Sequence, residues 1–358
     1  MTGRVLQSEY MHWAKTRAPV RYNLGSSEVP HFRLDRFDIE VADLELDGAS
    51  RHRDPPLRAA IARKAGIDPA QVVMADGTSM ANMLAMAALI APGDEVVVEQ
   101  PVYEPMVATA RFLGAGIRSF TRAGPDFALD PDAVAAAITP HTRLILVTNL
   151  HNPTGNFADE AALRAIGDIA ARADAHVLVD EVYLDAAPVP ARSAIHLGER
   201  FVCTASLTKV HGLSGLRCGW ILAAPDLAER MWRLNELFGV SQAHADERLS
   251  VIALDRLDEV MAHTPALLQR NRALANAFFA SRDEIEVAPL TGGITCFPRL
   301  LHGDIDALDA LLRERYDAAI VPGRFFGLAD HFRLGFGQPT EIVEGGLERL
   351  GAALDMLK

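Results

Sequence analysis

The sequence predicts an α/β protein built on an open, mainly parallel sheet with helices packed on both faces. Short apolar segments alternate with helical patterns through the middle of the chain. Most of these segments are rich in Val, Ile and Leu throughout, as strands buried on both faces are. The chain has 358 residues, 49% of them hydrophobic, so it is long enough to bury a sizeable core.

Six apolar segments are expected to form the strands: residues 71–74, 95–99, 143–148, 176–179, 201–204 and 220–223. A helix is expected soon after Gly155, where apolar residues recur every three or four positions, which gives the helix one apolar face. These residues are Leu163, Ile166, Ala170 and Ala173. Alternation of strands and helices favours parallel strands joined by helical crossovers.

The pattern changes after about residue 226, where helical periodicity continues to residue 279 without strand signals. A smaller α+β region follows, with strands near 293–298 and 331–335, a helix near 305–316 and a final leucine-rich helix. The first 45 residues are interrupted by prolines, and we expect them to pack against this C-terminal region. The predicted domains are therefore 46–249 (large) and 1–45 plus 250–358 (small).

Composition argues against several classes of protein. The net charge of −12 disfavours binding to nucleic acid, whose phosphates would be repelled. The three cysteines, Cys203, Cys218 and Cys296, are far apart, so neither a metal site nor a disulfide framework is expected. The N-terminus lacks the apolar run of a signal peptide, and no segment is long enough to span a bilayer. We expect a cytoplasmic protein that needs no membrane.

Five features carry the chemical signal, and each follows a predicted strand or lies in a loop. Taken singly they are weak: Asn-Pro-Thr-Gly is good turn chemistry, an acid at a strand end is commonly a helix cap, and most lysines are solvated. Their order and spacing are informative. They are Gly77-Thr78-Ser79, Asn152-Pro153-Thr154-Gly155, Asp180-Glu181-Val182-Tyr183, Ser206-Leu207-Thr208-Lys209 and Arg217.

Together these features resemble the fold-type I pyridoxal-5′-phosphate (PLP) enzymes, aminotransferase class I/II, from about residue 23 to 333. The resemblance makes the large domain the PLP-binding domain. Lys209 then matches the lysine that forms a Schiff base with the cofactor. Asp180 matches the acid that pairs with the pyridine nitrogen, and Tyr183 and Asn152 match the groups bonded to the 3′-oxygen. Tyr103 matches the aromatic that stacks on the ring.

The resemblance also implies a phosphate site and a substrate site. Arg333 resembles the arginine that clamps the substrate α-carboxylate, with Gly25 and Asn152 beside it. A turn of small residues at a helix N-terminus, with hydroxyls and a guanidinium, suits phosphate. The implied phosphate-binding residues are Gly77, Thr78, Ser79, Ser206, Thr208 and Arg217.

Two departures from the family pattern stand out. Many members carry a tyrosine ahead of the segment Leu57-Arg58 that reaches the neighbouring subunit's phosphate, and residues 44–56 contain none. Arg51, His52 or Arg53 could replace it, although solvated loop charges are the simpler interpretation. Leu150 replaces the family's usual proline before the Asn-Pro-Thr-Gly turn. Family members are generally homodimers, so the resemblance implies a homodimer.

The favoured function is transfer of an amino group from an L-amino acid to a 2-oxo acid. A lyase of the same family, such as a C–S β-lyase, would use the same catalytic residues, and histidinol-phosphate transamination is a narrower variant. A cofactor-binding regulatory domain without turnover is the hypothesis from another class. The sequence does not identify the substrate; Arg299 and Arg324 are the nearest unassigned arginines for a second carboxylate.

Overall fold

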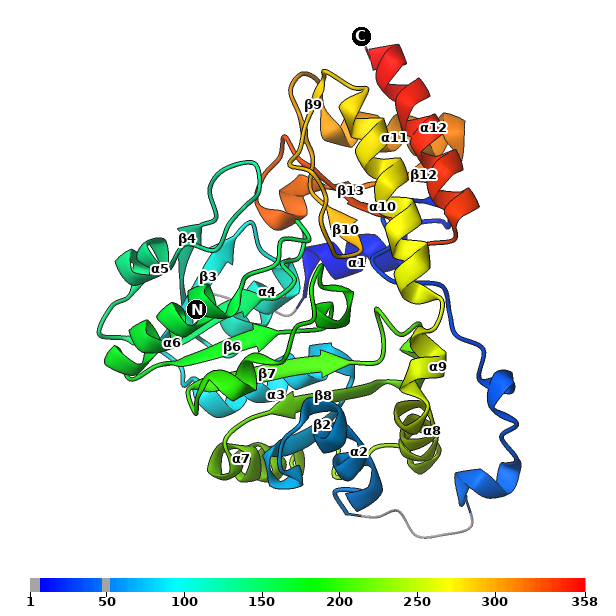
Figure 1. The fold of residues 1–358 in the computed structure, drawn as a ribbon. Helices are drawn as coiled ribbons and strands as arrows, with labels where there is room; N and C mark the ends of the chain where they lie inside the picture. Colours follow the sequence, from blue (N-terminus) through cyan, green and yellow to red (C-terminus); the bar gives the residue numbers. More distant parts are fainter. Residues whose placement is uncertain (1–6, 47–51, 358) are drawn as a thin grey trace.

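The computed structural model describes residues 7–46 and 52–357. Figure 1 shows a large sheet with its helices in the lower part of the molecule and a smaller part, which carries the C-terminus, above it. Each part has its own hydrophobic core. Helix α1 (Glu9–Thr16) lies between the two parts, so the N-terminal segment contributes to the boundary where they meet.

The large sheet has seven strands in the order β2-β8-β7-β6-β5-β3-β4. All run parallel except β8, which is antiparallel to both of its neighbours. The predicted fold class is confirmed, and each of the six predicted strands is present. The strands are β2 (Val72–Asp76), β3 (Glu95–Gln100), β4 (Gly116–Thr121), β5 (Thr142–Thr148), β6 (His176–Asp180), β7 (Phe201–Ser206) and β8 (Cys218–Leu222).

Strand β4 was not predicted from the sequence. It lies at the edge of the sheet, pairs with β3 alone, and only its Phe120 is buried. An edge strand keeps one side in solvent, so its sequence lacks the continuous apolar run that marks the central strands.

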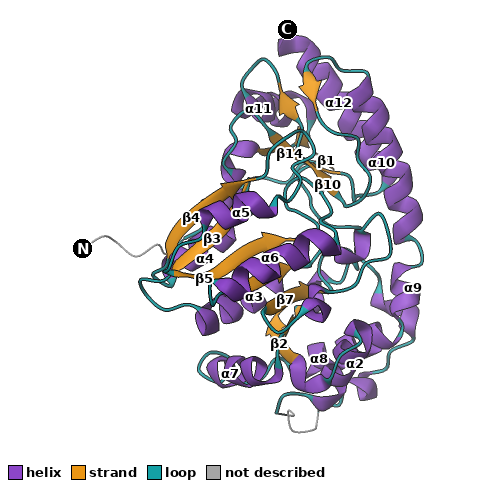
Figure 2. Ribbon diagram, turned by 60° about the vertical axis from the view of Figure 1, so that its left-hand side comes forward, coloured by secondary structure: helices purple, strands orange, loops and turns teal. Residues whose placement is uncertain are grey.

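Helices cover both faces of the sheet (Figure 2). The chain moves toward β4 through α3 and α4 and back toward β2 through α5 and α6, and right-handed crossovers place these pairs on opposite faces. Within the described ranges no helix is long and apolar enough to cross a membrane. The helices are α2 (Pro55–Ala65), α3 (Gly77–Leu89), α4 (Glu104–Phe112), α5 (Pro131–Ala137), α6 (Glu160–Arg172), α7 (Pro225–Asn235) and α8 (His244–Asp255).

The smaller part joins the two ends of the chain. Strand β1 (Tyr22–Asn23) pairs in parallel with β12 (Ala318–Ala319), so this part of the N-terminal segment packs on the C-terminal region. Three strands form β10-β14-β13 and two form β9-β11. The other elements are α9 (Leu257–Met261), α10 (Thr264–Ala280), β9 (Ile285–Glu286), β10 (Thr295–Cys296), β11 (Arg299–Leu300), α11 (Ile305–Tyr316), β13 (Val321–Pro322), β14 (Phe332–Gly335) and α12 (Thr340–Leu357).

Seven short 3₁₀ helices connect these elements, among the described residues. They are η1 (Leu34–Phe37), η2 (Val41–Leu44), η3 (Pro69–Gln71), η4 (Leu184–Ala186), η5 (Ala194–Leu197), η6 (Ser214–Leu216) and η7 (Gly323–Phe326). The predicted domain limits at 45/46 and 249/250 stay a prediction. Phe37, Ala253 and Val260 pack in the larger core, although they lie outside 46–249.

The carboxyl ends of the parallel strands meet at one edge of the sheet. Asp76, Thr148, Asp180 and Ser206 are the last residues of β2, β5, β6 and β7. Because β8 runs the other way, Arg217, which precedes it, lies at this same edge. The topology therefore brings the five sequence features together, as expected for ligand sites in open α/β sheets.

We predict that Gly167→Ala lowers the free energy of unfolding by roughly 1–2 kcal/mol, although alanine favours a helix over glycine by about 1 kcal/mol. A Cβ atom at Gly167 in α6 would lie 2.6 Å from Cε2 of Phe201, which is buried in β7. The measurement is urea unfolding of the cofactor-free chain. Asp168→Ala on the exposed face of α6 is the control, and a Gly167→Ala variant as stable as this control would contradict the prediction.

Candidate active site

A cavity of about 670 Å³ opens at the carboxyl edge of the sheet, between the two parts of the chain. Its wall combines strand ends of the large sheet with α1 and residues 23–31. Most of the residues singled out from the sequence line it: Gly25, Thr78, Ser79, Tyr103, Asn152, Asp180, Tyr183, Thr208, Lys209, Arg217 and Arg333. Gly77 and Ser206 lie directly behind this wall, in contact with Arg217 and Thr78.

Asp180 supplies a buried carboxylate at the end of β6. Its Oδ2 accepts a hydrogen bond from Asn82 Nδ2 (2.8 Å), and its Oδ1 accepts one from the Val182 amide (3.0 Å). Thr204 fixes Asn82 by donating to its side-chain oxygen at 2.6 Å. Burial raises the pKa of Asp180 to about 6, against the opposing effect of these two donors. The carboxylate therefore lacks a cationic partner strong enough to offset its burial.

Lys209 lies in the turn after β7, with about a third of its side chain accessible. Its Nζ is 3.7 Å from Oε2 of Glu28, a cavity residue that the sequence did not single out. The Lys209 carbonyl accepts from the Val29 amide at 3.1 Å, so the lysine turn is tied to the N-terminal segment. The amine of Lys209 is thus held at the meeting point of the two parts of the chain.

One end of the cavity gathers donors suited to a dianion. The hydroxyls of Thr78, Ser206 and Thr208 form a chain, with O–O distances of 2.7 Å on both sides of Ser206. Thr78 is the second residue of the 13-residue helix α3, whose first amide groups have no partner within the helix. Arg217 adds a guanidinium, held by the carbonyls of Ser214 (3.1 Å) and Asp76 (3.2 Å).

Gly77 is required at this place. It has a φ of +78°, which favours glycine, and a Cβ atom there would overlap the Arg217 guanidinium. The close approach of the guanidinium to the first turn of α3 therefore depends on the absence of a side chain.

Arg333 in β14 faces the cavity from the smaller part and is almost fully buried. Its Nη1 donates to Asn152 Oδ1 (3.2 Å), and its Nη2 donates to the Tyr10 hydroxyl (2.8 Å) and the Gly25 carbonyl (3.0 Å). Its Nε is buried without a partner among the described residues. These partners are neutral, so the guanidinium is a buried cation without a counter-ion, which suits an anionic ligand.

Two tyrosines complete the wall between Asp180 and Arg333. Burial raises the pKa of Tyr183 to about 12 and the pKa of Tyr103 further, so both phenols stay neutral and can donate. The Tyr103 ring meets the Tyr10 ring edge to face, with centroids 5.7 Å apart. The sequence did not identify Tyr10, because nothing local indicates that this helix residue reaches Arg333.

Other candidates from the sequence lie outside the cavity. Arg53 Nη1 is 2.5 Å from Glu229 of α7, and His52 is 3.7 Å from Glu236, so both side chains face α7. Arg51 lies outside the described residues. The two arginines considered for a second carboxylate are also engaged elsewhere, Arg299 with Asp330 and Arg324 with Asp306.

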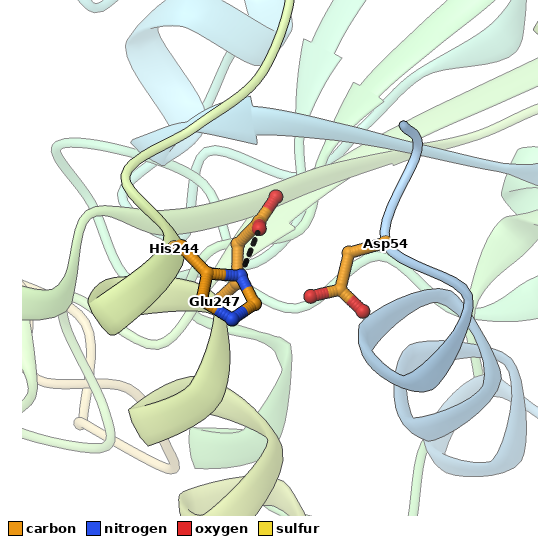
Figure 3. Close-up of side chains that lie close together, drawn as sticks. All are labelled: Asp54, His244 and Glu247. Atoms are coloured by element: carbon orange, nitrogen blue, oxygen red, sulfur yellow. Dashed lines mark ion pairs between the residues drawn. The ribbon is translucent and has the colours of Figure 1, made fainter. Parts of the chain in front are cut away.

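Asp54, His244 and Glu247 lie close together where α2 and α8 begin (Figure 3). Asp54 caps α2 by accepting from the Leu57 amide, and His244 Nδ1 is 3.6 Å from Glu247 Oε2. These groups lie outside the cavity lining, and we interpret them as part of the packing between α2 and α8.

Comparison with known proteins shows the family to which the chain belongs. Residues 45–350 match the family model of aminotransferase class I and II. The chain belongs to this family. It is 35% identical to capreomycidine synthase of Streptomyces vinaceus over 84% of the chain and 79% of that protein. It is 30% identical to histidinol-phosphate aminotransferase 2 of Ralstonia nicotianae, over 83% of the chain and 79% of that protein.

Solved structures of this aminotransferase fold superpose over nearly the whole chain. A PLP-dependent aminotransferase from Streptococcus suis has a TM-score of 0.91 at 22% identity, covering 99% of both chains. The PLP-dependent cyclase OrfR has a TM-score of 0.87 at 27% identity, covering 99% of this chain and 98% of that one. The likeness to the first of these shows the fold alone.

We predict that Asp180→Asn stabilises the cofactor-free aminotransferase at pH 8 but not at pH 3.5. An acid whose pKa is raised by folding favours the folded state below its unfolded pKa, near 3.8, and loses this contribution as the pH rises through about 6. The difference corresponds to about 3 kcal/mol. Unfolding of the wild type and of Asp180→Asn across this pH range measures the difference in their free energies of unfolding. A difference that does not change with pH would refute the prediction that folding raises the pKa of Asp180.

Proposed function

We propose that this aminotransferase-family protein uses PLP to move an amino group from an L-amino acid to a 2-oxo acid. The observation that carries the proposal is the arrangement around one cavity: the amine of Lys209, the buried carboxylate of Asp180 and the buried guanidinium of Arg333. When bound, PLP supplies a conjugated ring that accepts the electron pair left on the substrate Cα.

The donor set fits this cofactor. The hydroxyls of Thr78, Ser206 and Thr208, with Arg217 and the first turn of α3, would hold the phosphate. Asp180, whose burial lacks a strong counter-charge, would pair with the ring nitrogen. The neutral phenol of Tyr183 and the amide of Asn152 would bind the ring oxygen, and Tyr103 would lie against the ring face.

Each residue of the proposed site would have a separate role in the reaction. Lys209 would supply the nucleophilic amine and, once free, would carry the proton between the substrate Cα and the C4′ atom of the cofactor, as amino transfer requires. Asp180, as the anion, would keep the ring nitrogen protonated. Arg333 would hold the α-carboxylate through its planar fork, which fixes the direction of the Cα–H bond. Asn152 donates nothing to Arg333 and accepts from it, so its amide nitrogen remains available to the cofactor.

The proposal includes a homodimer and a cytoplasmic location. Leu237, Phe238 and Val240 follow α7 with 78%, 59% and 57% of their surface exposed. The same segment contacts the site edge, since Gln242 donates to Asp76 at 2.7 Å. A second copy covering this segment would bury its apolar surface beside the phosphate end of the cavity. The three described cysteines are free and buried, which agrees with a reducing compartment.

A second candidate is a reaction in which the substrate loses a β-substituent or cyclises. One curated relative is named a synthase and one structural neighbour a PLP-dependent cyclase. Lys209, Asp180 and Arg333 would serve this reaction as well, so only the products of the reaction distinguish the two candidate functions. Exchange of amino and oxo groups between two acids supports transfer. Pyruvate and ammonia from cysteine-like donors, or a cyclic amino acid, would support the second candidate.

We predict that PLP gives the protein a visible absorption band, that borohydride reduction labels Lys209, and that Lys209→Ala abolishes both along with amino transfer. Absorbance and peptide mapping measure these outcomes. Lys64→Ala is the matched control, because Lys64 pairs with Asp185 outside the cavity. Protein that stays colourless with PLP, or labelling at Lys64 in place of Lys209, would refute the proposal.

We predict that Arg333→Lys raises the KM for the amino donor on the order of 10²-fold, because an ammonium cannot reproduce the planar fork. Steady-state kinetics over a panel of amino acids and matched amines without the carboxylate measures the effect. In the Arg333→Lys variant, the matched amines should no longer be poorer substrates than the amino acids. Arg299→Lys, at a half-exposed position, is the control; an equal KM change there would argue against a carboxylate clamp at Arg333.

A further inference from the structure

A buried ion pair lies beneath the cavity, outside its lining. Glu99 in β3 and Arg122, just after β4, are each about 1% exposed. Arg122 donates to Glu99 Oε2 from Nε (2.9 Å), and its Nη2 forms an ion pair with the same oxygen at 2.7 Å. One carboxylate oxygen is therefore occupied by the guanidinium, and the other faces the loop that carries Asn152.

This second oxygen holds Thr148 at the end of β5. Glu99 Oε1 accepts from the Thr148 amide at 2.8 Å and from its hydroxyl at 2.7 Å. Because that hydroxyl donates its hydrogen bond to Glu99, its oxygen is directed to accept, and it accepts from the Asn152 backbone amide at 2.9 Å. The side-chain Oδ1 of Asn152 in turn accepts from Arg333. These hydrogen bonds, linked through the covalent frame of Thr148 and Asn152, connect Glu99 to the predicted carboxylate clamp.

A branch of the same network reaches the loop before Tyr103. The Nε2 atom of His151 lies 3.0 Å from the Pro101 carbonyl and 3.5 Å from Glu99 Oε1. A carbonyl can only accept, so Nε2 carries the proton, and Nδ1 accepts from the Thr154 hydroxyl at 2.7 Å. Burial and nearby Arg122 lower the pKa of His151, which keeps the ring neutral in this role.

We propose that Glu99 is a positioning residue that sets Asn152, and through His151 the Tyr103 loop, relative to Arg333. Arg122 provides the positive charge that lets a carboxylate remain in this apolar setting. The catalytic consequence rests on the proposed function, whereas the positioning itself is a property of the cofactor-free chain. Glu99 lies outside the cavity lining, so it positions the site residues through Thr148 and His151.

Glu99→Gln tests the proposal, because glutamine keeps the shape but offers one accepting oxygen in place of two. In the cofactor-free protein, we expect hydrogen exchange in a peptide spanning 149–156 to become at least ~10-fold faster, with exchange in β6 unchanged. In the loaded enzyme, kcat/KM should fall on the order of 10²-fold. A merely structural role would accelerate exchange in both segments alike.

Two further comparisons keep the test decisive. Glu181→Gln is the matched control: Glu181 is also buried, accepts from the Ala194 amide at 2.7 Å outside the cavity lining, and has a pKa raised by burial to about 7. It should leave exchange in 149–156 unchanged. If Glu99→Gln does not fold, Thr148→Val should reproduce the faster exchange and Thr148→Ser should retain protection.

The exchange result separates this inference from the proposed function. Wild-type protection of residues 149–156 in folded Glu99→Gln or in Thr148→Val overturns the positioning role, whatever reaction the enzyme catalyses. Accelerated exchange confined to that segment supports it, even if no amino donor is converted. Faster exchange in Glu181→Gln equal to that in Glu99→Gln would also overturn it, since any buried carboxylate would then have the same effect.

Discussion

The site depends on one constraint: a sheet buried on both faces can accept polar groups only where its strands end. The interiors of the central strands are mainly apolar, and most charged and hydroxylic side chains gather toward the carboxyl edge. Strand β8 adds Arg217 to this edge because it runs opposite to its neighbours. The reversal of β8 thus places a cation beside the first turn of α3. If β8 ran parallel to its neighbours, its own carboxyl end would lie there instead.

The cavity also carries incompletely compensated charge on opposite walls. Asp180 has two neutral donors and a pKa raised by burial, and Arg333 has neutral partners and an Nε atom without a partner among the described residues. A ligand with a cationic ring nitrogen at one end and a carboxylate at the other would relieve both. The cost of burying these groups lowers the stability of the empty chain, and binding recovers it.

The central strands could be predicted from the sequence because each is a local apolar run. The strand-end residues could be predicted because they form motifs in a fixed order. It missed β4, whose edge position removes the apolar run. It also missed Tyr10 and Asn82, which act across 323 and 98 residues of chain. Asn82 lies in the apolar part of α3, and only the packing of that helix on the sheet brings it to Asp180. Such contacts depend on the fold, and no fixed spacing of residues in the sequence indicates them.

The burial of Glu99 also could not be predicted from the sequence. In sequence it ends an apolar strand and resembles a residue emerging into solvent, yet it is buried with Arg122. A buried ion pair seldom adds net stability over apolar residues of similar volume. An apolar residue at position 99, however, would leave the Thr148 amide without its acceptor and free the Thr148 hydroxyl to rotate away from Asn152. The pair is therefore better explained by the geometry it imposes on two active-site loops than by its contribution to folding.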